Sequence, residues 1–171
     1  MFWIFSFFVL IILGSLGYGA LSAAPWVPTR KKDIDRLIRL AGTHPGEVVY
    51  ELGCGDARVL SCFVKTTGTK GIGIEVSLLQ YAFAKMRSWW IGPNLRIYWK
   101  NLFSVSLSEA DVVYLFLMPE AYAKLRPKFE KELKPGARVM SYVWPIPGWE
   151  SEQVDAQEGR ATIFLYKRPS L

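Results

Sequence analysis

Hydrophobic positions along the chain follow the two periods that distinguish helices from strands. In RKKDIDRLIRLAG, residues 30–42, apolar side chains recur at helical spacing and Gly42 ends the pattern, which predicts an amphipathic helix. Beyond it, short apolar runs typical of buried strands alternate with helical patterns. Strands are predicted at 47–52, 70–76, 95–102, 110–118, 137–144 and 161–168, and helices at 57–67, 77–90 and 120–133.

This alternation predicts an α/β fold. Strands that are apolar throughout suit a parallel sheet with helices on both faces, because both sides of each strand are then buried. The last strand, 161–168, follows a short polar stretch at 150–160, so we expect an antiparallel hairpin at the edge of the sheet. We expect the helix at 120–133 to continue through Pro127.

The first 29 residues contain no Asp, Glu, Lys, Arg or His. Residues 2–24 are long enough to cross a hydrocarbon core, which needs about 20 apolar residues. A cleavable signal peptide is the alternative, because small residues occur at 20–24, but a positively charged n-region is missing. We therefore expect a transmembrane anchor at 1–24, a linker at 25–32 and one folded domain at 33–171.

Basic residues follow this apolar segment and none precedes it, so the positive-inside rule places the domain in the cytoplasm. The net charge of +6 also suits anionic lipid head groups. A nucleic-acid partner is not expected, since the chain has neither zinc-finger spacing nor a basic run longer than three residues. The basic cluster consists of Arg30, Lys31, Lys32, Arg36 and Arg39.

The chain has two cysteines and one histidine. Cys54 and Cys62 lie in a turn and a helix of a domain that we place in the cytoplasm, where thiols stay reduced. His44 lies in a loop, so a Ser/His or Cys/His catalytic pair would depend on that single residue. Neither a disulfide nor a metal site is indicated.

A glycine turn follows the first strand of the predicted sheet, where open α/β sheets bind their ligands. Gly53 and Gly55 permit the positive φ angles of a tight turn and let a ligand approach the backbone closely. A dinucleotide fingerprint needs its third small residue where Arg58 stands, but the small residue here is Ala57. The spacing is one residue short of a dinucleotide site.

Two carboxylates accompany this turn. Glu51 suits a ligand that carries an ammonium and a sulfonium rather than a pyrophosphate, which predicts S-adenosylmethionine. Glu75 ends the second strand, where a carboxylate can accept both ribose hydroxyls of this cofactor or, equally, of NAD. The structural alternatives are an ion pair between Glu51 and Arg58 and a helix cap by Glu75 near Ser77.

Several segments together resemble a known family. Within residues 25–150 they occur in the order VPT, GEVVYELGCGDARVL, GIGIEV, ADVVYLFLMPE and KLRPKFEKELKPGARVMS. They are similar to small seven-β-strand methyltransferases that include the archaeal promiscuous protein-lysine methyltransferase and the mitochondrial enzymes that methylate adenine nucleotide translocase and the c-ring protein of ATP synthase. LMPE followed by KLRPK is more particular to this group than the glycine turn. The resemblance implies a Rossmann-like seven-stranded methyltransferase sheet.

The resemblance also implies which residues bind the cofactor. Asn101 stands where relatives commonly have an aspartate that faces the adenine, and its amide oxygen can still accept from the adenine amino group. Ala57 replaces a third glycine, and Tyr142 stands where relatives often have histidine. The expected cofactor-binding residues are Glu51, Gly53, Cys54, Gly55, Glu75, Val76, Asn101 and Leu102.

Methyl transfer to lysine needs a neutral amine in line with the methyl group. Free lysine has a pKa of about 10.4, so the site must help the amine to lose its proton. Glu120, directly after Pro119, is the expected catalytic residue, and the alternative for it is an acid favoured by the helix dipole. Aromatic rings can hold the ammonium by cation–π attraction. The expected substrate-binding residues are Trp26, Thr29, Tyr114, Tyr122 and Trp144.

Taken together, these features predict a membrane-anchored methyltransferase that acts on lysine side chains of a membrane or membrane-associated protein. One alternative is a methyltransferase that acts on a lipid or a small molecule. Another is a noncatalytic, membrane-tethered module that binds the cofactor. Neither a metal nor a nucleic acid is expected as a partner.

Overall fold

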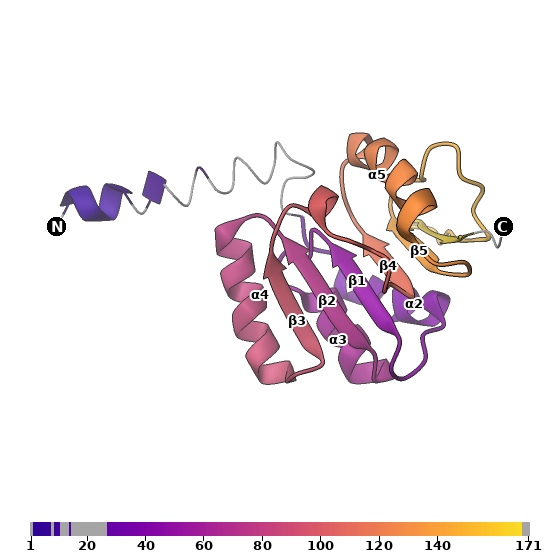
Figure 1. Ribbon diagram of the computed structural model, residues 1–171, viewed down its shortest axis with the longest axis horizontal. Helices are drawn as coiled ribbons and strands as arrows, with labels where there is room; N and C mark the ends of the chain where they lie inside the picture. The colour runs from indigo at the N-terminus through magenta and orange to yellow at the C-terminus, as the bar shows by residue number, and fades with distance from the viewer. Residues whose placement is uncertain (1, 8, 11–13, 15–26, 169–171) are drawn as a thin grey trace.

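The computed structural model describes residues 2–7, 9–10, 14 and 27–168 of the chain. Seven strands form one sheet with the order β3-β2-β1-β4-β5-β7-β6 (Figure 1). The strands are β1 (Val48–Leu52), β2 (Lys70–Glu75), β3 (Leu95–Trp99), β4 (Val112–Leu115), β5 (Arg138–Tyr142), β6 (Gln153–Asp155) and β7 (Ile163–Lys167). The helices are α2 (Lys31–Ala41), α3 (Arg58–Thr67), α4 (Leu78–Ile91) and α5 (Pro119–Glu132), with a 3₁₀ turn η1 (Leu102–Ser104).

The alternation of strands and helices is as predicted. Strands β1 to β5 pair in parallel, and β7 runs antiparallel to β5. The expected hairpin differs in one respect, because Gln153–Asp155 forms a short strand β6 that pairs antiparallel with β7. The edge strand is therefore β6, and β7 lies inside the sheet.

Helices cover both faces of the sheet, as the apolar strands predict. One cluster of buried side chains joins α2, α3 and α4 to one face and includes Leu37, Phe63 and Ala84. A second cluster joins α5 to the other face and includes Tyr122 and Phe129. In Figure 1, α2 and α3 lie behind the sheet and α5 lies in front of it. Helix α5 continues through Pro127, as expected.

The predicted anchor at 1–24 and Trp26 lie mostly outside the described residues. Within the part of the chain that the structure describes, no helix is long and apolar enough to cross a membrane.

Gly73 in β2 leaves room for side chains of the glycine turn and of β3. A Cβ atom at Gly73 would lie 2.8 Å from both Cys54 Sγ and Ile97 Cδ1. We expect Gly73→Ala to lower the free energy of unfolding by about 1–3 kcal/mol, because a well-packed core does not accept an extra methyl group. Denaturant unfolding measures this, and adding Ile97→Val, which removes the Ile97 Cδ1 atom, should recover part of the loss. Unchanged stability of Gly73→Ala would contradict the packing of this strand.

Candidate active site

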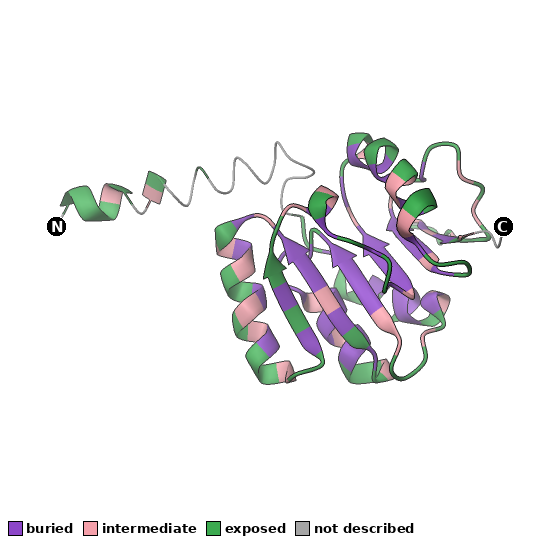
Figure 2. Ribbon diagram, in the orientation of Figure 1, coloured by how far each residue is buried: buried purple, intermediate pink, exposed green. Residues whose placement is uncertain are grey.

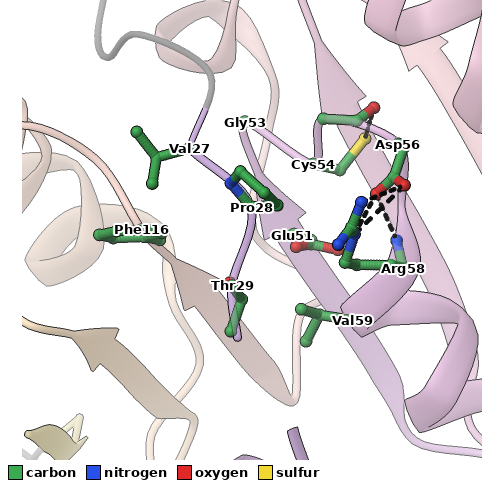
Figure 3. Close-up of a pocket in the computed structure, with 11 residues that line it drawn as sticks. Val27, Pro28, Thr29, Glu51, Gly53, Cys54, Asp56, Arg58, Val59 and Phe116 are labelled. Carbon is green, nitrogen blue, oxygen red and sulfur yellow. Dashed lines mark hydrogen bonds and ion pairs between the residues drawn. The ribbon is translucent and has the colours of Figure 1, made fainter. Parts of the chain in front are cut away.

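Two adjoining clefts open at the carboxyl ends of the central strands. The first, about 310 Å³ in volume, lies between the chain that enters the domain and the glycine turn after β1 (Figure 3). The second, about 650 Å³, lies beside the ends of β4 and β5. Both clefts share Val27, Pro28 and Phe116 as walls. The two clefts are therefore neighbours, with these three residues between them.

Glu51 is the buried acid of the first cleft. It ends β1 with 5% of its surface exposed, and its Oε2 atom accepts a hydrogen bond from the Leu60 N–H at 3.1 Å. The expected alternative, an ion pair with Arg58, is not found, because the Arg58 guanidinium binds Asp56 at 2.9 Å (Figure 3). Burial raises the pKa of Glu51 well above its usual range. Such a carboxylate favours a cationic ligand.

Three residues in or directly after the glycine turn have positive φ angles. Gly53 and Gly55 have φ values of 75° and 54°, as the sequence predicts for a tight turn, and Ala57 also adopts the left-handed region at 57°. The N–H groups of Gly53 and Cys54 both donate to the Ile74 carbonyl, which ties the turn to β2. The protein's own backbone therefore positions the turn.

Glu75 holds this turn from the end of β2. Its Oε2 atom accepts from the Gly55 N–H at 2.8 Å, and its Oε1 atom accepts from the N–H groups of Val76 and Ser77. The alternative of a cap near Ser77 is therefore partly correct. A carboxylate has about four acceptor positions, so Oε2 keeps one for a ligand hydroxyl. Burial raises the pKa of Glu75.

The eight expected cofactor residues do not all line the first cleft. Glu51, Gly53, Cys54 and Gly55 line it. The other four, which are Glu75, Val76, Asn101 and Leu102, follow or end the neighbouring strands β2 and β3.

The residues after β3 form part of this same edge of the sheet. Asn101 accepts from the Phe103 N–H through its Oδ1 atom, which keeps a second acceptor position for a ligand donor such as the adenine amino group. Leu102 is buried. Cys54 is also buried, which raises the pKa of its thiol well above the usual range and makes it a poor nucleophile.

Two of the expected substrate residues contact each other. The Thr29 hydroxyl lies 2.7 Å from the Tyr114 hydroxyl, and both side chains are buried. Tyr114 pairs with Glu51 in the register of β4 and β1. Thr29 lines the first cleft, whereas Tyr114 is buried behind it with 1% of its surface exposed, so its ring is not open to a lysine ammonium as expected.

The other expected substrate residues are scattered. Tyr122 is fully buried and its hydroxyl lies near the Leu115 carbonyl, so this ring is also not open to a lysine ammonium as expected. Trp144 follows β5 and is 44% exposed, whereas Trp26 lies outside the described residues. Pro119 is the first residue of α5 and Glu120 is exposed in its first turn. Neither lines the first or the second cleft.

The second cleft contains residues that the sequence patterns did not single out as site residues. The rings of Phe116 and Tyr142 lie edge to face, with their centroids 4.8 Å apart. Arg30 and Arg160 add positive charge at this cleft. Val143 has a φ of 77°, a strained conformation for a β-branched residue. The position of Phe116 directly after a strand was an available signal, whereas Arg160 lies in a polar stretch without a recognisable pattern.

Tyr142 is held from behind by a buried charge network. Its hydroxyl donates to Asp33 Oδ2 at 2.8 Å, and Asp33 also pairs with Arg36 at 2.8 Å. Burial and the carboxylate of Asp33 raise the pKa of Tyr142 to about 12. The Tyr142 hydroxyl therefore stays protonated at neutral pH, and its hydrogen bond to Asp33 fixes the orientation of the ring.

The first cleft fits S-adenosylmethionine on three observations from the structure. Glu51 is a buried acid without an ion pair to Arg58, and an ammonium group beside it would favour its ionised form. A Cβ atom at Gly53 would lie 2.9 Å from Leu117 Cδ2 and the φ angle there is 75°, so this turn at the wall of the cleft requires glycine. The free acceptor position of Glu75 suits a ribose hydroxyl.

Comparisons with known proteins agree with this arrangement. A family model described as the ANTKMT methyltransferase domain matches residues 51–153, which include the glycine turn. A protein-lysine N-methyltransferase from Saccharolobus islandicus (strain REY15A) is 36% identical over 148 residues, which are 83% of this chain and 92% of that protein. The adenine nucleotide translocase lysine N-methyltransferase of Mus musculus is 28% identical over 144 residues, which are 83% of this chain but 62% of that protein.

Solved structures support the same fold and the same cofactor. A structure described as an RNA methyltransferase from Salinibacter ruber, in complex with S-adenosyl-L-homocysteine, is similar to this chain with a TM-score of 0.81 and 32% identity. The similarity covers 85% of this chain and 95% of that one. These matches confirm the resemblance that the sequence segments indicate.

Proposed function

The chain belongs to the ANTKMT methyltransferase-domain family and uses S-adenosylmethionine; from this premise we propose that it methylates lysine side chains of a protein. The observation that carries the proposal is the pair of adjoining clefts. The first has a buried acid for a cationic cofactor. The second has the aromatic walls Phe116 and Tyr142, which suit the aliphatic stem of a lysine, and its two arginines disfavour the ammonium and so favour the neutral amine that the reaction needs. The lysine methyltransferases among the relatives support this choice of acceptor.

When bound, S-adenosylmethionine supplies an electrophilic methyl group on a sulfonium. The chain's own residues then have three tasks. Glu51 attracts the cofactor's ammonium, and Glu75 accepts a ribose hydroxyl. Phe116, which borders both clefts, excludes water from the path between them. These tasks are positioning and electrostatics, which is how a protein assists a reactive cofactor.

The acceptor amine must reach the methyl group without its proton. We propose that Tyr142 orients the amine. Its hydroxyl donates a hydrogen bond to Asp33, and the hydroxyl oxygen can still accept a hydrogen bond from the amine. Glu120 is proposed to take the proton through water, because its carboxylate is exposed in the first turn of α5. The role of Glu120 should affect turnover, whereas the role of Tyr142 should affect the KM for the acceptor.

We expect Glu120→Gln to lower turnover by roughly 10²-fold, the usual scale for a positioned base, with little change in cofactor affinity. The loss should shrink at high pH, where more lysine is already neutral. Tyr142→Phe should instead raise the KM for the acceptor about tenfold, as for one lost hydrogen bond. Steady-state kinetics across a pH series measure both. Near-normal turnover of Glu120→Gln at neutral pH would return this residue to its alternative role as a helix-start acid.

We also propose that residues 1–24 anchor the enzyme in a membrane, with residues 33–171 on the cytoplasmic side. The support is the charge-free sequence of the first 29 residues and the basic cluster after it. The anchor would bring the clefts near membrane proteins. A C-terminal reporter that is active only in the cytoplasm should be active, and activity of a reporter restricted to the other side would overturn the orientation.

The acceptor class is tested by the distribution of label. Membranes from the native host, incubated with the full chain and cofactor labelled in the methyl group, are separated into protein, lipid and RNA. We expect label in protein, and Glu75→Ala as a binding-deficient control should abolish it. Label in lipid would favour the lipid alternative. Label in RNA would extend to this chain the activity named for the Salinibacter ruber protein.

A further inference from the structure

The outer side of α4 is apolar, the reverse of what a surface helix normally presents. Its residues toward the sheet are Gln80, Ala84 and Ser88, all buried. Figure 2 shows the side away from the sheet in green and pink. The residues of this outer face are Leu79, Ala82, Phe83, Met86, Trp89 and Trp90.

The outer face of α4 is continuous and contains no polar residue. At about 100° per residue its six members occupy an arc of about 120°. Phe83 and Met86 are each 49% exposed, Trp89 is 74% exposed and Trp90 is 85% exposed. Scattered apolar residues on a surface need no explanation, but a continuous apolar face marks an interaction site.

Positive charge borders this face. Lys85 and Arg87 lie on either side of the arc, as the same helical geometry places them. The Arg87 guanidinium is paired with Asp56 at 2.9 Å, so within the described part of the chain Lys85 contributes the unpaired charge beside the arc. Residues 76–108, which contain α4 and β3, include four basic side chains and no Asp or Glu. The surroundings of the outer face therefore favour an anionic partner.

A further tryptophan is exposed near the start of α4, beside the outer face. Trp99, the last residue of β3, is 57% exposed and its ring centroid lies 6.4 Å from that of Tyr81. Its indole N–H donates to the Val76 carbonyl, which fixes the ring at the surface. Tryptophan beside lysine and arginine is the composition of the interface between a bilayer and water.

We propose that the outer face of α4 rests on an anionic lipid bilayer. Apolar rings then enter the boundary of the acyl chains while Lys85 and the neighbouring basic residues meet the head groups. A second copy of the chain fits less well, because an isologous interface would bring Lys85 and Arg87 near their own symmetry mates. This contact is separate from the proposed anchor and from the choice of acceptor, and it adds an orientation: the domain would lie with the β3 edge of its sheet toward the membrane.

A nitroxide label on the full chain tests the proposal. The label is placed by Met86→Cys, with Ala123→Cys, an exposed position on α5, as the matched control. Cys62→Ser removes the partly exposed thiol, and Cys54 is buried. Each chain is mixed with vesicles of phosphatidylcholine alone or with phosphatidylserine added, and the collisions of the label with oxygen and with a water-soluble nickel chelate are measured.

We expect the label at 86 to lose access to the nickel chelate and gain access to oxygen only with phosphatidylserine, while the label at 123 stays accessible. Adding Trp89→Ser and Trp90→Ser should weaken the effect. Unchanged nickel access at 86 in both vesicles would overturn the proposal. Loss of access without vesicles would also overturn it, in favour of a segment of the chain itself. Dipolar broadening between labels would overturn it in favour of a second copy.

Discussion

Replacing Glu51 by glutamine is expected to weaken the binding of S-adenosylmethionine roughly 10- to 150-fold and, in the same protein, to raise the free energy of unfolding. The affinity falls because a charge-assisted hydrogen bond, worth about 1.5–3 kcal/mol, is lost. The stability rises because burial has raised the pKa of this carboxyl well above its usual 4.5. Titration calorimetry and denaturant unfolding measure the two effects, with the exposed Glu109→Gln as a control that should change neither.

The pH dependence of the same residue has a definite sign. The folded chain keeps a proton on Glu51 that the unfolded chain releases above its usual pKa, so the stability contributed by this group falls as the pH rises. A bound ammonium favours the ionised carboxylate, so cofactor binding should release protons and strengthen as the pH rises. Calorimetry in two buffers of different ionisation enthalpy detects this release, and an equal release by Glu51→Gln would contradict the assignment.

The largest loss of stability is expected at Arg36. This guanidinium is almost fully buried and binds Asp33, Asp155 and the Ala161 carbonyl. Arg36→Met should lower the free energy of unfolding by about 3 kcal/mol, the lower end for breaking a buried pair, because water reaches Asp155. Adding Asp33→Asn should recover part of the loss, since it removes a buried charge that would keep, among the described residues, only the Arg160 guanidinium, 3.6 Å away, as its ion-pair partner.

Arg39→Met on the same helix is the matched control, because Arg39 is exposed. Arg36→Met should also affect the second cleft, because Arg36 positions Asp33 and Asp33 accepts the hydrogen bond from the Tyr142 hydroxyl. A stability of Arg36→Met within about 0.5 kcal/mol of the parent, the range of ordinary surface changes, would contradict the role of this network.

The main strands and the glycine turn were predictable because each depends on local chemistry. Buried parallel strands are apolar throughout, and residues such as Gly53 and Gly55 stand where positive φ angles are needed. Strand β6 was missed because it has three residues, of which Gln153 and Asp155 are polar. Its pairing depends on β7 and leaves no pattern of its own.

The second cleft was less predictable because its residues meet only in three dimensions. Phe116, Tyr142 and Arg160 come from separate segments that the sheet brings together. Aromatic residue type alone also did not separate Tyr122, which fills the core, from an exposed ring. Burial of a ring depends on which face of the sheet or helix it occupies, and that is a property of the whole fold.

We propose that the protein transfers a methyl group from a cofactor in the first cleft to the side-chain nitrogen of a lysine in the second. The most direct test is to hydrolyse the protein that the enzyme labels and to identify the labelled amino acid. We predict that the label migrates with Nε-methylated lysine, and that Glu51→Gln greatly reduces it. Label on another side chain, or label confined to lipid or nucleosides, would contradict the account.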